Sequence, residues 1–251
     1  MIIECLLRHS VGKRGIRCIH TSQRLAKEAL KNSKNKSQSS QEWLRRQLND
    51  PYVRRARYEN YRARSVFKLM EMDEKYGLLS PGMIVVDCGA APGAWTQYVV
   101  QRLKLDASEP HTTGAVIGVD IRPIQPIAGA ILLSNTDFTK PLNQSKILHS
   151  LNGKSVDVVL SDMAPNASGQ HDFDSMAIHA LCYSALQFSL TVLRPFSGTF
   201  VTKVWEGPTT PALRNDLSVF FSEVKHLRPD ACRGDSTESY ILCRHFKGVK
   251  R

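Results

Sequence analysis

Short apolar segments that alternate with helical stretches constrain the fold of this chain more than any other feature of its sequence. The apolar segments lie at 83–87, 115–120, 130–133, 156–161 and 198–204, with two more at 224–228 and 239–244. Helical patterns occur at 95–105, 175–193 and 210–221. Apolar strands that alternate with helices are typical of a parallel sheet covered on both faces. We therefore expect an α/β fold whose ligands bind at the carboxyl ends of the strands.

The turn after the first strand, residues 87–95 (DCGAAPGAW), has the composition of a ligand-binding loop. Gly89 and Gly93 allow the backbone to approach a ligand closely, and Pro92 stiffens the turn. Neither the dinucleotide pattern G-x-G-x-x-G nor the phosphate-binding pattern G-x-x-x-x-G-K-S/T occurs in the sequence. The expected ligand is therefore an adenosyl group without phosphates.

Two acids follow the next two strands, where they can contact such a ligand. Asp120 ends the second strand and is placed to accept hydrogen bonds from both ribose hydroxyls of an adenosine. Asp137 comes after the third strand and is placed for the exocyclic amine of adenine. The alternative is a generic α/β turn with incidental acids.

The net positive charge of the chain comes entirely from its N-terminal quarter. Residues 1–64 contain 16 Lys and Arg against 5 Asp and Glu, whereas residues 65–251 contain 18 of each kind. Residues 1–34 are rich in arginine and lysine, poor in acids and mixed with apolar residues, which is typical of a mitochondrial transit peptide. The alternative is a disordered basic tail. Residues 32–41 have the composition of a polar linker, so ordered structure is expected to begin near Gln41.

A basic arm follows this linker and remains after removal of a transit peptide. Tyrosines and a tryptophan are interleaved with its arginines, and these residue types bind phosphates and stack on unpaired bases. For the tyrosines, packing on the core is an equal alternative. The arginines expected to contact RNA are Arg54, Arg55, Arg57, Arg62 and Arg64.

The cysteines and histidines exclude several classes of protein. The six cysteines occur singly and the eight histidines lack metal-ligand spacing, so we expect no metal and no disulfide framework. A reducing, intracellular compartment fits this pattern. We also expect no membrane span, because no apolar run approaches the ~20 residues that one requires.

Five motifs in order resemble the FtsJ/RrmJ family of RNA 2′-O-methyltransferases. They are RSVFKL (64–69), DCGAAPGAW (87–95), SDMAPNASG (161–169), VTKVW (201–205) and STESY (236–240), and the resemblance extends from about Asp50 onwards. It implies a Rossmann-like class I methyltransferase fold with a mostly parallel seven-stranded sheet, and S-adenosyl-L-methionine as cofactor. The expected division is a transit peptide and disordered N-terminus (1–34), a linker and basic arm (35–64) and a methyltransferase domain (65–251).

The resemblance also implies which residues form the site. The family's Lys-Asp-Lys-Glu tetrad corresponds to Lys68, Asp162, Lys203 and Glu238. Any one of these could instead be an ordinary salt-bridge partner, although a lysine in the apolar strand 199–205 needs a functional reason. The expected cofactor residues are Asp87, Gly89, Ala91, Pro92, Gly93, Trp95, Asp120, Asp137 and Asp162.

The chemistry of such a reaction explains why the site would need two lysines. A ribose 2′-hydroxyl is a poor nucleophile, so the enzyme must align it with the methyl donor and help to remove its proton. A lysine can accept this proton near neutral pH only where burial or a second cation favours its neutral form. We expect Lys203 to be this base, Lys68 to be the second cation, and the four groups to titrate together.

The resemblance implies a substrate but leaves alternatives open. The implied target is a uridine in the large-subunit rRNA of mitochondria, modified by a monomer in the matrix, with rRNA in a large-subunit precursor as partner. A transit peptide speaks against mRNA cap methylation. Methylation of tRNA remains an alternative, as does a non-catalytic ribosome-assembly factor that uses the fold only to hold RNA.

Overall fold

The computed structural model describes residues 37–106, 113–165, 169, 171–234 and 236–249. The predicted transit peptide therefore lies outside the described residues. Contacts divide the chain into two units, residues 1–55 and residues 56–251. We describe each unit by itself.

The described part of the first unit is helical. Helix α2 (Gln38–Asn49) begins where the Ser37 hydroxyl accepts a hydrogen bond from the Ser40 N–H at 3.4 Å. Helix α2 thus begins three residues before the expected Gln41, because a serine cap supplies a helix start within a polar segment. Helix α3 (Pro51–Tyr58) crosses into the second unit, and its first turn is capped by the Asp50 carboxylate, which accepts from the Tyr52 N–H at 3.0 Å.

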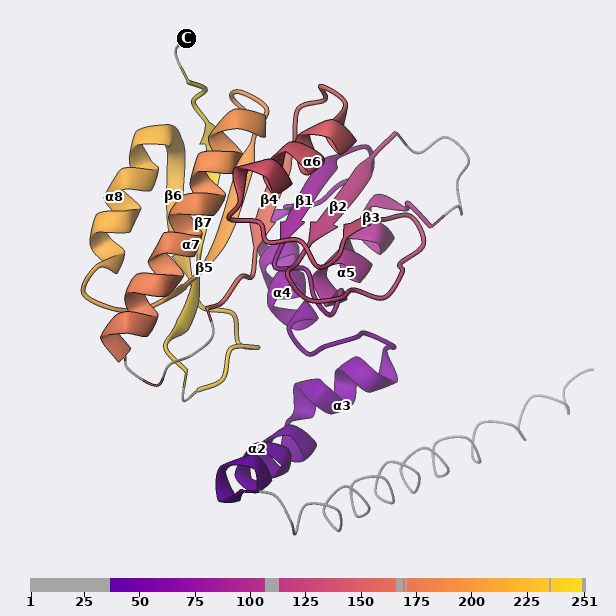
Figure 1. The fold of residues 1–251 in the computed structure, drawn as a ribbon, viewed down its shortest axis with the longest axis vertical. Helices are drawn as coiled ribbons and strands as arrows, with labels where there is room; N and C mark the ends of the chain where they lie inside the picture. Colours follow the sequence, from indigo (N-terminus) through magenta and orange to yellow (C-terminus); the bar gives the residue numbers. More distant parts are fainter. Residues whose placement is uncertain (1–36, 107–112, 166–168, 170, 235, 250–251) are drawn as a thin grey trace, which may run out of the picture. The chain divides into compact units, whose positions relative to one another are not determined.

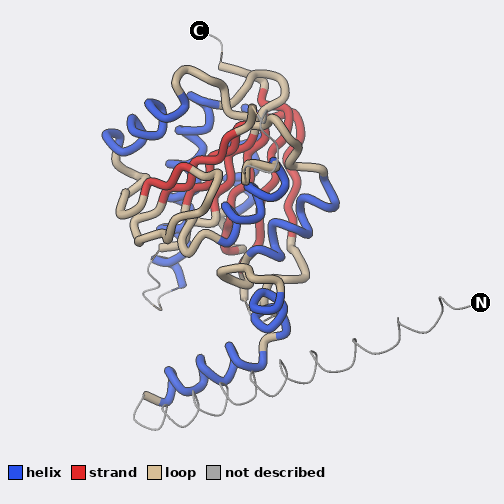
Figure 2. The backbone as a smooth tube through the Cα atoms, turned by 90° about the vertical axis from the view of Figure 1, so that its right-hand side faces the viewer, coloured by secondary structure: helices blue, strands red, loops and turns tan. Residues whose placement is uncertain are grey.

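The second unit is built around a seven-stranded, mostly parallel sheet, as predicted. Its strand order is β3-β2-β1-β4-β5-β7-β6, and β7 alone runs antiparallel to its neighbours. Figure 2 shows the strands as a layer between helices. The strands are β1 (Ile84–Cys88), β2 (Ala115–Val119), β3 (Ile131–Leu133), β4 (Val158–Ser161), β5 (Thr199–Trp205), β6 (Phe221–Leu227) and β7 (Glu238–Phe246).

Helices cover both faces of this sheet. One face packs against α6 (Pro141–Leu151), α7 (His171–Val192) and α8 (Thr210–Phe220), which lie in front of the sheet in Figure 1. Helices α4 (Val66–Tyr76) and α5 (Ala94–Leu103) contact each other, and α5 packs on β1 and β2. The order reverses between β1 and β4, and the carboxyl edge at such a reversal is where sheets of this kind bind ligands.

Helix α7 has the length and composition of a membrane span. Its segment Phe173–Val192 is the only such helix among the described residues. Half of that segment is buried, and Ile178, Cys182 and Ala185 belong to the hydrophobic core beside β4 and β5. It is a core helix, because its apolar face packs against the sheet.

The sequence patterns did not predict α4 and α6 in the second unit, nor α2 and α3 in the linker and basic arm. In α4, Val66, Phe67, Leu69 and Met72 are buried together with Lys68 and Asp73, so its burial pattern mixes apolar and charged positions. That mixture conceals the usual amphipathic period. Gly77 ends the helix in a left-handed conformation with φ of 61°.

Candidate active site

The register of β5 and β7 places three polar side chains on one face of the sheet. Lys203 lies directly opposite Tyr240, and Trp205 lies opposite Glu238. Alternate residues of a strand point to the same face, so Lys203, Tyr240 and Glu238 share one face at the carboxyl edge of β5. Tyr240 is fully buried and Lys203 is 8% exposed.

Asp162 follows β4 and meets Lys203. The Nζ atom of Lys203 lies 3.1 Å from Asp162 Oδ1 and donates to the main-chain oxygen of Asp162 at 2.6 Å. Burial opposes ionisation of Asp162, but Lys203, Lys68 and the Tyr240 hydroxyl outweigh it, so the pKa of Asp162 lies below its usual value. Asp162 is therefore a carboxylate at neutral pH.

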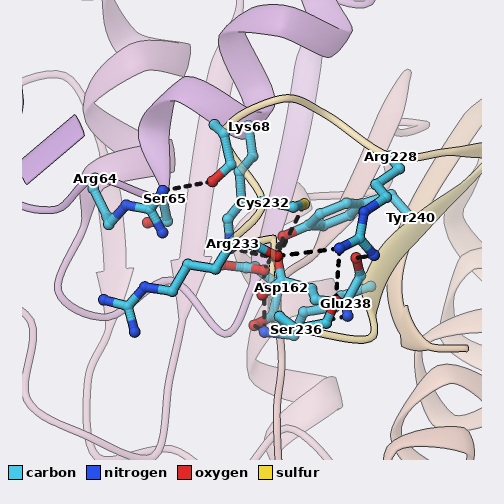
Figure 3. Close-up of polar contacts among 12 residues, drawn as sticks. Arg64, Ser65, Lys68, Asp162, Arg228, Cys232, Arg233, Ser236, Glu238 and Tyr240 are labelled. Carbon is cyan, nitrogen blue, oxygen red and sulfur yellow. Dashed lines mark hydrogen bonds and ion pairs between the residues drawn. The ribbon is translucent and has the colours of Figure 1, made fainter. Parts of the chain in front are cut away.

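Lys68 forms the second ion pair of the site, with Glu238 (Figure 3). It lies on the first turn of α4 and is buried, with 7% of its surface exposed. Cys232 lies beside the pair, and its thiol is 3.8 Å from Glu238 Oε1. Burial and the Glu238 charge raise the pKa of Cys232 to about 11, so it remains a neutral thiol.

The Tyr240 hydroxyl joins the two ion pairs. It lies 2.7 Å from Asp162 Oδ1 and 2.8 Å from Glu238 Oε1, so its single proton is shared between two carboxylates. Burial, together with those two carboxylates, raises the pKa of Tyr240 well above its usual value. Tyr240 was not among the expected site residues. Its position two residues after Glu238 in a strand could have indicated a shared face.

The loop between Glu238 and β6 is held by Arg228. Its guanidinium donates to the main-chain oxygens of Glu238 at 3.1 Å and of Ser236 at 2.7 Å (Figure 3). Arg64 donates to the main-chain oxygen of Ala231 at 2.7 Å in the same loop. Two arginines therefore fix the backbone that presents Glu238 to Lys68.

The glycine-rich loop joins β1 to α5 with little room to spare. Gly89 has φ of 82°, and a Cβ there would lie 2.8 Å from the Met163 nitrogen. Gly93 has φ of 109°, and a Cβ there would lie 2.7 Å from Arg62 Nη1. The Ala91–Pro92 peptide is cis. Both glycines are needed, because a side chain would be strained and would collide with its neighbours.

Asp87 begins this loop and is fully buried. Its Oδ2 accepts from the Thr96 hydroxyl at 2.6 Å, whereas its Oδ1 has no partner among the described residues. Burial raises the pKa of Asp87 to about 7, and the neighbouring Asp162 and Asp120 add to this. A buried acceptor close to two further acids fits a ligand that carries a positive charge and an N–H donor.

The two predicted acids after β2 and β3 have different surroundings. The Asp120 carboxylate accepts from the Ala91 N–H and the Arg122 N–H, both at 2.8 Å, so it is held against the glycine-rich loop. Asp137 accepts from the Thr139 hydroxyl at 2.6 Å, and this bond lowers the pKa of Asp137. Both carboxylates keep acceptor capacity for a ligand.

Trp95 links the glycine-rich loop to the segment that carries Lys68. Its indole N–H donates to the Ser65 main-chain oxygen at 2.8 Å, and its ring lies 5.8 Å from the Tyr240 ring. Trp95 thus connects the glycine-rich loop both to the segment before Lys68 and to Tyr240.

The five arginines of the basic arm separate into two groups. Arg54, Arg55 and Arg57 are exposed on α3. Arg62 and Arg64 instead donate to backbone carbonyls of the second unit. The sequence offers no basis for separating the five, because nothing in the composition of the arm distinguishes an exposed arginine on α3 from one that donates to the backbone of the second unit.

Comparison with known proteins identifies the relatives of this chain. The family model described as FtsJ-like methyltransferase matches residues 61–246. The chain is 44% identical over 236 residues to rRNA methyltransferase 2, mitochondrial, of Drosophila melanogaster, covering 93% of this chain and 94% of that protein. It is 42% identical over 222 residues to ribosomal RNA large subunit methyltransferase E of Xanthobacter autotrophicus, covering 88% of this chain and 85% of that protein.

A solved structure has the same architecture. It is described as a ribosomal RNA methyltransferase from Plasmodium falciparum and is 27% identical to this chain, with a TM-score of 0.66. The match covers 75% of this chain and all of that one. The second unit therefore has the architecture of a methyltransferase of known structure.

Proposed function

Because the chain belongs to the FtsJ-like methyltransferase family, we propose that it transfers a methyl group from S-adenosyl-L-methionine to a ribose 2′-hydroxyl of mitochondrial large-subunit rRNA. The single observation that carries this proposal is the set of two lysine–carboxylate pairs, both lysines buried, joined by the Tyr240 hydroxyl at the carboxyl edge of the sheet. Transfer to a hydroxyl requires removal of a proton, and a buried lysine beside a second buried cation can accept one.

Lys203 is the residue that we assign as the base. Its Nζ atom lies beside the Asp162 carboxylate, and in its neutral form it would accept the proton of the 2′-hydroxyl. Lys68 is the second buried lysine of the site. Asp162 holds the Lys203 Nζ in place, and Glu238 balances the charge of Lys68. The Tyr240 hydroxyl keeps the two carboxylates at a fixed separation.

The residues of the glycine-rich loop fit S-adenosyl-L-methionine, which supplies a methyl group on a positively charged sulfur. Asp87 Oδ1 is a buried acceptor without a partner among the described residues, and it suits the ammonium of the methionine part. Asp120 would hold the ribose and Asp137 the adenine amine. Gly89 and Gly93 have no side chain that would collide with neighbouring groups, so the backbone of this loop can approach the cofactor closely.

The substrate follows from the relatives and the compartment from the N-terminal sequence. A relative that shares 44% of its residues over nearly the whole chain is named as a mitochondrial rRNA methyltransferase. Relatives at similar identity are named as ribosomal RNA large subunit methyltransferases. The acid-poor basic segment 1–34 supports import into the mitochondrial matrix. We propose a uridine ribose in a large-subunit precursor as the target, and a monomer as the active form.

A methyl-transfer assay on three RNA substrates tests the proposal. Radiolabelled S-adenosyl-L-methionine is incubated with isolated mitochondrial large-subunit rRNA, with a large-subunit precursor and with mitochondrial tRNA, and resistance to alkaline cleavage locates the modified ribose. We expect label in the large-subunit RNA only. Label in tRNA alone would replace rRNA as the substrate, and an absence of label on all three substrates would favour a non-catalytic assembly factor.

A pair of lysine variants links this activity to the site. Lys203→Ala should abolish transfer, whereas Lys154→Ala, the same change at an exposed lysine, should leave it intact. Equal turnover in the two variants would contradict the assignment of Lys203 as the base.

A further inference from the structure

The guanidinium of Arg62 is occupied by the backbone of two loops. Its Nη1 donates to the main-chain oxygens of Pro92 at 3.0 Å and of Gln125 at 2.7 Å. Its Nη2 donates to the main-chain oxygen of Pro126 at 2.7 Å. Three of the five N–H donors of this arginine are thus used at the end of the side chain that would otherwise bind a phosphate. The group also lies close to Gly93, where an added Cβ would approach Nη1 to 2.7 Å.

From this geometry we infer that Arg62 is a positioning residue for the cofactor pocket, and that it sets the separation of the loops after β1 and β2. The inference rests on the proposed function and deepens it, because it transfers Arg62 from the RNA-binding arm to the cofactor site. The loop after β1 contains Pro92, and the loop after β2 contains Gln125 and Pro126. A cofactor that touches both Asp87 and Asp120 must contact the ends of both strands, so the relative position of these two loops affects its binding.

A second arginine supports the same two loops from within. Arg122 Nη2 donates to the Ala91 main-chain oxygen at 3.0 Å, and the Asp120 carboxylate accepts from the Ala91 N–H at 2.8 Å. These bonds join the loops close to Asp120. Arg62 joins them one residue further along the first loop, at Pro92. Without Arg62 the turn at Pro92 and Gly93 would lose its connection to residues 125 and 126.

The segment that carries Arg62 is itself fixed to α5, the helix that begins at the glycine-rich loop. The Arg62 N–H donates to Gln97 Oε1 at 2.9 Å, and the Tyr61 hydroxyl donates to Gln101 Oε1 at 2.6 Å. The arginine is therefore held at both its backbone and its side chain. A side chain fixed in this way costs little additional entropy when the loops close on a ligand.

Arg57 provides a matched contrast within the same arm. It is exposed on α3, five residues before Arg62. If the arm divides as the geometry indicates, Arg57→Ala should weaken RNA binding and lower the salt slope by about 1, with the affinity for the cofactor unchanged. Arg62→Ala should weaken cofactor binding and leave RNA binding and its salt slope unchanged.

The experiment measures cofactor binding and RNA binding separately for wild type, Arg62→Ala, Arg62→Lys and Arg57→Ala. Calorimetry with S-adenosyl-L-methionine in the absence of RNA gives the first quantity, and RNA titrations at several salt concentrations give the second. We expect Arg62→Ala to weaken cofactor binding about tenfold, to raise the KM for the cofactor by a similar factor, and to leave kcat at saturating cofactor and the RNA salt slope close to wild type. Arg62→Lys should fall between, because an ammonium cannot span three carbonyls as a planar fork does.

A normal cofactor affinity in Arg62→Ala, with weaker RNA binding and a smaller salt slope, would overturn the inference and return Arg62 to the RNA-binding group. Equal losses of cofactor affinity in Arg62→Ala and Arg57→Ala would overturn it as well. If Arg62→Ala does not fold, as judged by circular dichroism, Arg62→Lys decides by the same two quantities. Failure of the wild type to bind the cofactor would instead contradict the proposed function, so the two failures are distinguishable.

Discussion

Replacement of Asp87 by asparagine should change how the stability of the cofactor-free protein depends on pH. Burial raises the pKa of this carboxyl from its usual 3.8 to about 7 in the folded state. Below pH 3.8 the group is neutral in both states. Between that value and about 7 the unfolded chain releases the proton while the folded protein keeps it, so wild-type stability falls as pH rises through this window.

The size of the effect follows from the same pKa values. A difference of roughly 3 between the folded and unfolded values corresponds to about 4 kcal/mol of unfolding free energy, as an order of magnitude. Asparagine does not titrate, so Asp87→Asn should not carry this loss. The amide can still accept from the Thr96 hydroxyl, but its NH₂ group takes the position of the unpartnered Oδ1. That adds a constant offset, so the pH dependence is the informative quantity rather than stability at one pH.

Urea unfolding of the cofactor-free chain at several pH values between 4 and 8 would measure this difference. The stability of Asp87→Asn relative to wild type should rise by a few kcal/mol between pH 4 and pH 7.5 and then level off. Asp137→Asn is the control: the Thr139 hydroxyl lowers the pKa of Asp137 below 3.8, so this carboxyl is ionised in both states over most of this pH range and the relative stability of the variant should stay nearly constant. A relative stability of Asp87→Asn that is constant with pH would refute the reasoning. The same variant should bind S-adenosyl-L-methionine more weakly.

Three further outcomes are expected from the site and the arm. Lys203→Ala should abolish methyl transfer and leave cofactor and RNA binding nearly unchanged, which single-turnover assays and calorimetry would check; retained turnover would exclude it as the base. Tyr240→Phe removes the hydroxyl shared by two carboxylates and should lower kcat by about tenfold to a hundredfold, with little effect on RNA affinity; an unchanged kcat would show that the bridge is dispensable. Replacement of both Arg54 and Arg57 by alanine should weaken RNA binding and reduce the slope of log K against log salt by about 2; an unchanged slope would move the RNA contact away from α3.

Much of the sheet could be predicted because most of its strands are buried on both faces, with β3 and β6 as the exceptions. Segments such as 156–161 and 198–204 consist mainly of apolar residues with a Gly, Pro or acidic turn beyond them, and burial on two faces requires this composition. The predicted strand ends differ from the observed ones by at most three residues. The glycine-rich loop was located for a similar reason, since its conformation demands glycine at two positions.

The role of Arg62 could not be predicted, because it depends on contacts between distant segments, and strand alternation alone indicated only that Tyr240 shares a face with Glu238. Tyr240 joins the site only through the antiparallel register that sets it opposite Lys203. Arg62 differs from Arg57 only because the loops after β1 and β2 present carbonyl oxygens to it. Sequence composition reports the type of a side chain and not its partners, so arginines with different surroundings are indistinguishable at that level.

The position of β7 has a consequence for how the protein is made. It is the last of the described strands along the chain, yet it lies between β5 and β6 and is the only described strand that pairs with β6. A growing chain that stops before residue 238 can contain the glycine-rich loop, Lys68, Asp162 and Lys203, but it leaves β6 without a neighbour and the edge of β5 exposed. Addition of β7 fills the position between β5 and β6, and the same strand supplies Glu238 and Tyr240. Synthesis therefore completes the proposed catalytic set last, and a prematurely terminated product lacks the groups that balance Lys68 and join the two ion pairs.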